Sequence, residues 1–184
     1  MKKIGKKFPG DPSQQQIVES MVRVDHAGEY GAVRIYEGQL AVLGNQEVVP
    51  KIKQMLNQER VHLKKFESEI INRRVRPTAL LPLWHVLGFA LGAGSALFGS
   101  KAAMACTVAV EEVIDKHYEE QIDEIGNYPD EVDLKSTFQD FRDEELEHRD
   151  TGLENGANAF AGHFVLNNLV KIGSKAAIWL SKRI

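Results

Sequence analysis

The stretch from Thr137 to Gly152, TFQDFRDEELEHRDTG, holds a carboxylate and an imidazole that could bind a metal ion together. Glu145 and His148 lie three residues apart, and Phe138 and Phe141 fall on the same helical face. The phenylalanines mark this face as the buried one. A buried carboxylate and imidazole need a compensating partner, and a metal ion is the partner that this spacing suggests.

Three other segments offer matching side chains. Glu59 and His62 repeat the Glu-x-x-His spacing on a stripe of apolar residues. Glu29 is a single glutamate in the middle of another apolar stripe. In a fourth segment two glutamates are adjacent, and only the stripe through Glu111 is apolar, so we expect Glu111 to face inward and Glu112 to face water.

Helices must position these side chains, because no strand pattern rises above background. Asp11-Pro12-Ser13 is a helix-start signal with Ser13 as the N-cap. The predicted helices run from Ser13 to about Leu43, from about Val48 or Lys51 to Asn72, from about Lys101 to Ile125, through Thr137–Gly152 after a turn at Gly126–Asp130, and from about Ala157 to Lys182.

The distances from the motifs to the turns predict that the four motif-bearing helices meet at one level. Glu29 lies 15 residues before Gly44, and Glu111 lies 15 residues before Gly126. At about 1.5 Å per residue, each glutamate is roughly 20 Å from its turn, and the following Glu-x-x-His returns to a similar height. Two antiparallel hairpins would bring four carboxylates and two imidazoles together inside an all-α, ferritin-like four-helix bundle.

This ligand set predicts a centre of two metal ions. The proposed ligands, which are also the predicted catalytic residues, are Glu29, Glu59, His62, Glu111, Glu145 and His148. Oxygen and nitrogen ligands without thiolate suit iron or manganese, and four carboxylates balance two divalent ions. The alternative is a plain bundle with buried Glu–His salt bridges, in which two imidazoles would compensate four carboxylates poorly.

Several further residues are weaker candidates. Tyr118 lies on the inward stripe and could relay protons or electrons, although a buried tyrosine commonly only packs. Asp25 and His26 precede Glu29 by about one turn and could hydrogen-bond a ligand, or form a pair on the helix surface. The remaining candidates, His85, His163 and Cys106, are interpreted as interface or core residues.

Composition excludes several classes of protein. A formal charge of -3 over 184 residues gives no basic field for nucleic acid. The single cysteine, Cys106, excludes a disulfide framework and a thiolate-rich metal site. The first 13 residues carry four lysines and are too short and polar for a secretory signal. We therefore interpret residues 1–12 as a flexible basic tail and residues 13–184 as one domain.

Residues 77–100 contain no Asp, Glu, Lys or Arg. Their length alone would permit a membrane span. Pro82, four glycines and His85 argue against one, and a span would separate the two halves of the metal site. We expect a short hydrophobic crossover helix that meets the membrane interface; the alternative is an extra core helix. The last helix is amphipathic and basic, which suits a membrane surface, a partner helix or its own bundle.

Motifs along the chain resemble the demethoxyubiquinone hydroxylases of ubiquinone biosynthesis. They are VDHAGEYGA around Glu29, QERVHLKKF around Glu59, RVRPTALLPLWHVLGFALGAGSALFG, MACTVAVEE around Glu111 and FRDEELEHRDTGL around Glu145. The resemblance covers nearly everything from Ser20 to Ile184. It implies a non-haem di-iron monooxygenase that hydroxylates the ring of a polyprenylated quinone with O2 and electrons from NADH. The family places its iron ligands on the six residues proposed above.

The resemblance carries further expectations. It implies a peripheral membrane protein, on the cytoplasmic face of a bacterial inner membrane or the matrix face of the mitochondrial one, and the lack of a clear presequence favours the bacterium. A lipid-presenting partner is implied for mitochondria, and a homo-oligomer is expected. Soluble di-iron enzymes often carry Asp before the Glu of Glu-x-x-His; this chain has Gln58 and Glu144 there, so that supporting role is not carried over.

Two rival functions use the same residues differently. A ferritin- or rubrerythrin-like protein would oxidise iron or dispose of peroxide at this site, but it has no use for a long apolar run. A membrane-associated helical adaptor would use the polar layer only to fix helix register, and it would purify without stoichiometric iron.

Overall fold

The computed structural model describes residues 10–184, and over these residues the chain forms six α-helices and two short 3-10 helices with no strand. They are α1 (Gln14–Leu43), α2 (Val49–Arg73), α3 (Leu81–Leu97), α4 (Ser100–Ile125), η1 (Pro129–Glu131), α5 (Val132–Glu154), η2 (Ala157–Ala159) and α6 (His163–Ser181). Most of the tail expected at residues 1–12 lies outside the described residues. The division into a tail and one domain stays a prediction.

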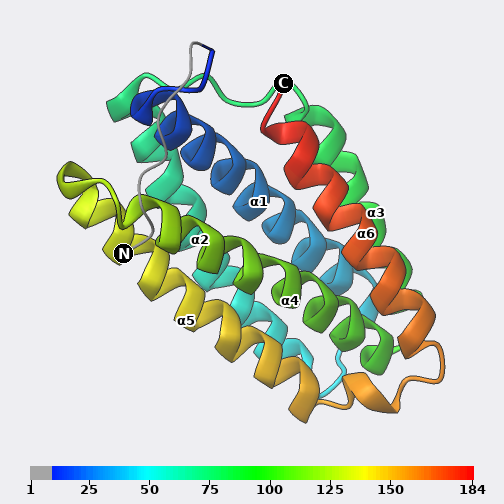
Figure 1. The fold of residues 1–184 in the computed structure, drawn as a ribbon. Helices are drawn as coiled ribbons and strands as arrows, with labels where there is room; N and C mark the ends of the chain where they lie inside the picture. The colour runs from blue at the N-terminus through cyan, green and yellow to red at the C-terminus, as the bar shows by residue number, and fades with distance from the viewer. Residues whose placement is uncertain (1–9) are drawn as a thin grey trace.

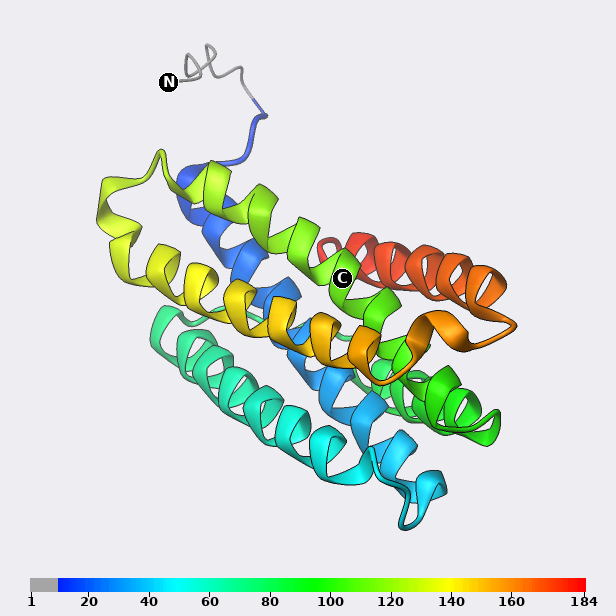
Figure 2. The same ribbon diagram turned by 90° about the horizontal axis from the view of Figure 1, so that it is seen from below.

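Four long helices form two antiparallel hairpins. α1 packs against α2, and α4 packs against α5. The two hairpins lie side by side with their axes roughly aligned (Figure 1), and the view from below shows the same four helices around a common interior (Figure 2). The predicted all-α, ferritin-like bundle is therefore confirmed.

Local sequence determines where α1 and α2 begin and end. The hydroxyl of Ser13 accepts a hydrogen bond from the Gln16 backbone N–H at 3.2 Å, and the Gln16 side chain accepts one from the Ser13 N–H at 2.8 Å. This reciprocal capping box satisfies two backbone donors at the start of α1, as the sequence predicts. α2 ends where Arg74 adopts a left-handed conformation with φ of 55°, three residues before Pro77.

The predicted start of the last helix at Ala157 is wrong. Gly156 takes a φ of 85°, residues 157–159 form a 3-10 turn, and Phe160 is extended. α6 begins only at His163, after Gly162. The detour buries Ala157 completely against α4, so the reversal of the chain at Gly156 is compensated by packing.

Two apolar clusters fill the two ends of the bundle. One lies near the α1–α2 turn and contains Tyr36, Leu43, Ile52, Met55 and Met104 among its buried members. The other lies at the opposite end and contains Val22, Phe66, Ile125, Leu134 and Phe138. The predicted ligands lie on the same helices, between these clusters in the sequence. Close packing at both ends therefore holds the middle of the bundle in place.

α3 crosses from one hairpin to the other along α1. Its backbone approaches α1 so closely that a Cβ on Gly92 would lie 1.9 Å from the carbonyl oxygen of Ile35. In α3 itself only Gly92, Ser95 and Ala96 are buried, so the alternative of an extra core helix does not fit. α3 is a crossover helix, as predicted.

α3 and α6 lie on the same side of the bundle, to the right in both views (Figures 1 and 2). They meet at one end, where Trp84 Nε1 donates a hydrogen bond to Ser181 Oγ at 3.1 Å. This apolar side exposes large hydrophobic residues from both helices: Leu83, Val86, Leu87, Leu97, Phe164, Val165, Leu169, Ile172 and Trp179. Over residues 10–184, no helix combines the length and the apolar character needed to cross a bilayer.

Candidate metal centre

The structure brings all six predicted ligands together in the interior of the bundle. Each is at most 4 % exposed. Their ligand atoms form two groups whose members lie within 4.8 Å of one another: Glu29, Glu59, His62 and Glu145 in the first, and Glu59, Glu111, Glu145 and His148 in the second. Two carboxylates, Glu59 and Glu145, belong to both groups. This arrangement could hold two neighbouring cations that share two ligands.

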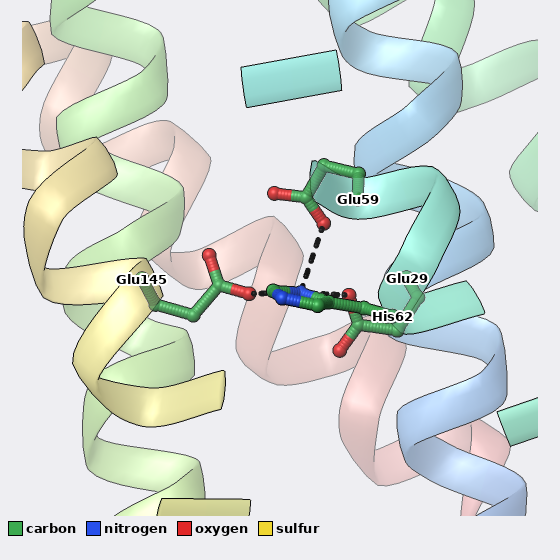
Figure 3. Close-up of side chains that lie close together, drawn as sticks. All are labelled: Glu29, Glu59, His62 and Glu145. Atoms are coloured by element: carbon green, nitrogen blue, oxygen red, sulfur yellow. Dashed lines mark ion pairs between the residues drawn. The ribbon is translucent and has the colours of Figure 1, made fainter. Parts of the chain in front are cut away.

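The first group shows how the helices converge. The imidazole of His62, from α2, lies among the carboxylates of Glu29, Glu59 and Glu145 (Figure 3). Its Nδ1 is 3.3 Å from Glu145 Oε1 and 3.5 Å from Glu29 Oε2. In the second group, Nδ1 of His148 is 3.1 Å from an oxygen of Glu59 and 3.1 Å from an oxygen of Glu145. Both imidazoles therefore turn Nδ1 toward the shared carboxylates.

The choice between the two adjacent glutamates of α4 agrees with the sequence analysis. Glu111 is 2 % exposed and lies in the centre. Glu112 points the other way, toward the surface, where its carboxylate forms an ion pair with Lys171 of α6. Periodicity alone separated the inward residue from the outward one.

The centre contains buried polar atoms that other described residues leave unsatisfied. Over residues 10–184, both carboxylate oxygens of Glu59 and the Nδ1 of His62 have no hydrogen-bond partner. Buried polar atoms without partners are unfavourable and rare in folded proteins. These atoms belong to the predicted ligands and face one another, so the residues present fit a metal centre.

The pKa shifts indicate that the centre retains protons in the absence of a cation. Burial raises the pKa of Glu59, and the neighbouring Glu145 and Glu29 add to the shift. Burial also raises the pKa of Glu111. Burial works against the charged form of His62, but the nearby carboxylates of Glu145 and Glu29 outweigh it and raise the pKa to about 12. Protons thus occupy the positions where cations would otherwise compensate the carboxylates.

Two tyrosines cross between the hairpins to reach the glutamates. The Tyr118 hydroxyl donates a hydrogen bond to Glu29 Oε1 at 2.5 Å, so this predicted residue touches the centre. The Tyr36 hydroxyl donates to Glu111 Oε1 at 2.9 Å and was missed as a site residue. A signal was present in the chain, because each tyrosine lies seven residues after the glutamate of its own helix. Burial raises the pKa of both phenols, which keeps the donated protons in place.

Asp25 and His26 do not have the predicted role. Oδ1 of Asp25 accepts a hydrogen bond from Gln121 Nε2 at 2.9 Å and lies 3.1 Å from Nε2 of His117. Asp25 therefore pairs with side chains of α4 that are not ligands, and both residues are buried, so neither forms a surface pair. His26 Nδ1 has no hydrogen-bond partner among the described residues.

The remaining candidates, His85, Cys106 and His163, do not belong to the two groups of potential metal ligands. Nδ1 of His85 lies 2.6 Å from the Tyr30 hydroxyl, where α3 meets α1, which fits the predicted interface role. Cys106 is fully buried in an apolar cluster, and burial raises the pKa of its thiol to about 12, as expected for a small core residue. His163 begins α6, and its Nε2 has no hydrogen-bond partner within residues 10–184.

Each of the two histidines His62 and His148 also has a partner at Nε2, on the side of the ring away from the proposed metal ligands. Nε2 of His62 is 3.0 Å from Glu144 Oε2, and Nε2 of His148 is 3.1 Å from Gln58 Oε1. These are the two positions for which a supporting role could not be carried over from other di-iron enzymes. A cavity of about 170 Å³ opens beside Gln58 and His148 and is also lined by Glu147. Polar side chains therefore lie on the outer side of both imidazoles.

Comparison with known proteins gives consistent results along most of the chain. Residues 16–181 match the family model described as ubiquinone biosynthesis protein COQ7. The 3-demethoxyubiquinol 3-hydroxylase of Rhodospirillum rubrum is 55% identical over 179 residues, which span 97% of this chain and 84% of the relative. The NADPH-dependent 3-demethoxyubiquinone 3-hydroxylase of Homo sapiens, a mitochondrial protein, is 51% identical over 95% of this chain and 81% of its own. The mitochondrial 5-demethoxyubiquinone hydroxylase of Saccharomyces cerevisiae is 40% identical over 94% and 80%.

Proposed function

The chain belongs to the family of the ubiquinone biosynthesis protein COQ7, as its motifs indicated, and we propose that it is a di-iron monooxygenase that hydroxylates the ring of a demethoxyubiquinone. One observation carries this proposal: four helices place four carboxylates and two imidazoles in one buried layer. Relatives along nearly the whole chain are named as hydroxylases of this substrate class.

The six residues would hold two iron ions. Glu29 and His62 would bind one ion, Glu111 and His148 the other, and the shared Glu59 and Glu145 would contact both. When bound, iron would supply the redox chemistry that activates O2 for insertion into a ring C–H bond. The ligand set suits this choice because it contains oxygen and nitrogen donors without thiolate.

The reaction needs protons as well as electrons. One atom of O2 enters the ring as a hydroxyl group and the other leaves as water, which consumes two electrons and two protons. The Tyr118 hydroxyl oxygen lies 2.5 Å from Glu29 Oε1 and donates its proton there, and the Tyr36 hydroxyl oxygen lies 2.9 Å from Glu111 Oε1 and does the same. We assign Tyr118 to orienting Glu29 and to passing a proton at its hydroxyl oxygen; Tyr36 orients Glu111 in the same way.

A nicotinamide nucleotide is the proposed source of electrons. The motifs led us to expect NADH, whereas several mitochondrial relatives are named as NADPH-dependent. We propose only that the electron donor is a nicotinamide nucleotide. The assay below compares NADH and NADPH directly.

The apolar side formed by α3 and α6 is the proposed route for the substrate tail. Its exposed hydrophobic residues would contact the surface of a membrane, and the exposed Lys175 of α6 would favour anionic lipids. A tail inserted there would leave only the ring to enter the bundle. We propose that this membrane is the bacterial inner membrane, approached from its cytoplasmic face, or the mitochondrial inner membrane, approached from its matrix face. We also propose that a second copy of the chain or a lipid-presenting partner would bind the apolar side of the protein.

A labelled-oxygen assay tests the function. Iron-loaded protein would receive a short-tailed demethoxyquinone in detergent, isotopically labelled O2, and either NADH or NADPH. We expect a product heavier by one labelled hydroxyl oxygen, and no such product from Glu145→Ala. The proposal would be overturned in favour of ferritin-like chemistry if iron were oxidised or the nucleotide consumed without labelled product, even after a lipid-presenting partner protein had been added.

A further inference from the structure

The two histidines proposed as metal ligands are each contacted at Nε2 by a residue that is not itself a proposed ligand. Glu144 precedes the ligand Glu145 on α5, yet its carboxylate meets His62 of α2 at 3.0 Å. Gln58 precedes the ligand Glu59 on α2, yet its side-chain oxygen meets His148 of α5 at 3.1 Å. Each hairpin therefore supports the imidazole of the other.

These contacts determine the tautomers of both imidazoles. A carboxylate only accepts hydrogen bonds, so Nε2 of His62 carries the proton that it shares with Glu144. The Gln58 amide nitrogen donates to the same Glu144 oxygen at 3.5 Å, which leaves the Gln58 carbonyl oxygen to accept from Nε2 of His148. Both rings thus have a protonated Nε2 on the outside, and Nδ1 is left for a metal ion on the inside.

The two supports differ in charge. Glu144 offers a carboxylate, and Gln58 offers a neutral amide. A carboxylate hydrogen-bonded to a ligand imidazole makes it a stronger electron donor, and such partners change metal affinity by about 10–100-fold. The Glu144 side chain is 39% exposed, so solvent weakens its charge, and we expect the lower end of this range.

The two metal positions otherwise resemble each other. Each has one unshared glutamate, one imidazole and the same two shared carboxylates. Each unshared glutamate accepts a hydrogen bond from a tyrosine of the opposite hairpin. The two positions thus differ in the charge of the residue that contacts the imidazole: a carboxylate at His62 and a neutral amide at His148.

We propose that Gln58 and Glu144 are positioning residues that orient both imidazoles, and that their different charges make the two metal positions unequal. The position at His62 binds its ion more tightly and favours the higher oxidation state. The position at His148 binds more weakly. The inference rests on the proposed function only in requiring two metal ions, and it needs neither quinone nor O2.

The test is an anaerobic calorimetric titration of the full chain with ferrous ion. We expect two unequal binding steps in the unsubstituted protein. Glu144→Gln weakens the tighter step by about tenfold and brings the two steps together. Gln58→Glu strengthens the weaker step, and the protein with both substitutions regains two unequal steps.

A spectroscopic readout separates positioning from general stability. Mössbauer spectra of protein loaded with iron-57 should resolve two ferrous sites, and Glu144→Gln should make them more alike. In zinc-loaded protein with nitrogen-15-labelled histidine, both rings should show a protonated Nε2. Glu144→Gln should keep this tautomer because the amide oxygen still accepts a hydrogen bond from Nε2 of His62. Glu144→Ala should remove this hydrogen bond, so that the orientation of the His62 ring is no longer fixed.

Glu147→Gln is the matched control. It removes the same charge from the same helix, and Glu147 lines the cavity beside His148 rather than supporting an imidazole. We expect this variant to titrate like the unsubstituted protein. Equal responses of Glu144→Gln and Glu147→Gln, or two identical steps in the unsubstituted protein, would overturn the inference while leaving hydroxylation to be judged by the labelled-oxygen assay.

Discussion

Replacing Glu59 by methionine should stabilise the metal-free protein while destroying the centre. Both carboxylate oxygens of Glu59 are buried without hydrogen-bond partners among the described residues, and burial raises the pKa of this carboxyl group. A methionine of similar length can fill the same space without a polar atom that needs a partner. The only close cationic neighbours of Glu59 among the described residues are the imidazoles of His62 and His148, so the buried carboxyl group is unfavourable for folding, and ligand binding explains its presence.

The expected magnitude follows from the cost of a buried unsatisfied group. Removing such a group recovers about 1–3 kcal/mol. Urea unfolding in the presence of a chelator should show a higher midpoint for Glu59→Met with an unchanged slope. Added ferrous ion should stabilise the unsubstituted protein and leave the variant almost unaffected, because its two positions share the missing ligand.

Glu145→Met is the matched comparison and should have the opposite effect. Burial alone would raise the pKa of Glu145, but hydrogen bonds with His148 and His62 outweigh it and lower the pKa to about 2. A shift of this size corresponds to roughly 3 kcal/mol of stability, present above the ordinary carboxyl pKa and lost as the pH falls toward 2. The metal-free protein should therefore lose stability in this variant. Equal destabilisation by both substitutions would refute the reasoning.

Three further predictions concern the centre and the apolar side. Metal binding should release protons, because Glu59, Glu111, His62 and other ligands with raised pKa values must lose theirs; apparent affinity measured by competition titration should rise with pH. Tyr118→Phe should lower kcat by about 100-fold while two metal ions still bind, measured by turnover and metal analysis. Ile172→Glu should weaken sedimentation with anionic vesicles without changing metal content, because it places a charge on the apolar side.

Sequence was sufficient for the parts of the site that depend on local periodicity. A helix with a regular apolar stripe determines which side chains face inward, so the apolar stripe of α4 alone distinguishes Glu111 from Glu112. Similar distances from the turns indicated that the ligands of both hairpins would meet. Turn chemistry was less reliable: the 3-10 turn after Gly156 delays α6 to His163, because burial of Ala157 outweighs the continuous helical pattern.

The individual side-chain partners across the two hairpins were beyond the sequence analysis. Whether Gln58 supports an imidazole depends on how α2 and α5 face each other across the bundle, and periodicity within one helix does not contain that information. Asp25 illustrates the same point, since its spacing from Glu29 suggested a contact with a ligand but its side chain meets His117 and Gln121 of α4. Tertiary geometry decided both cases.

The two hairpins repeat the same contacts with different residues. Gln39 lies ten residues after Glu29 and donates to Thr107, while Gln121 lies ten residues after Glu111 and donates to Asp25.

Thr107 and Asp25 each lie four residues before the glutamate of their own helix, so the pattern is an approximate two-fold repeat like that of the tyrosines. Every polar contact in this repeat runs from one hairpin to the other. Each hairpin therefore receives contacts from the other that help to orient its ligands, and assembly of the complete metal centre depends on the docking of both halves.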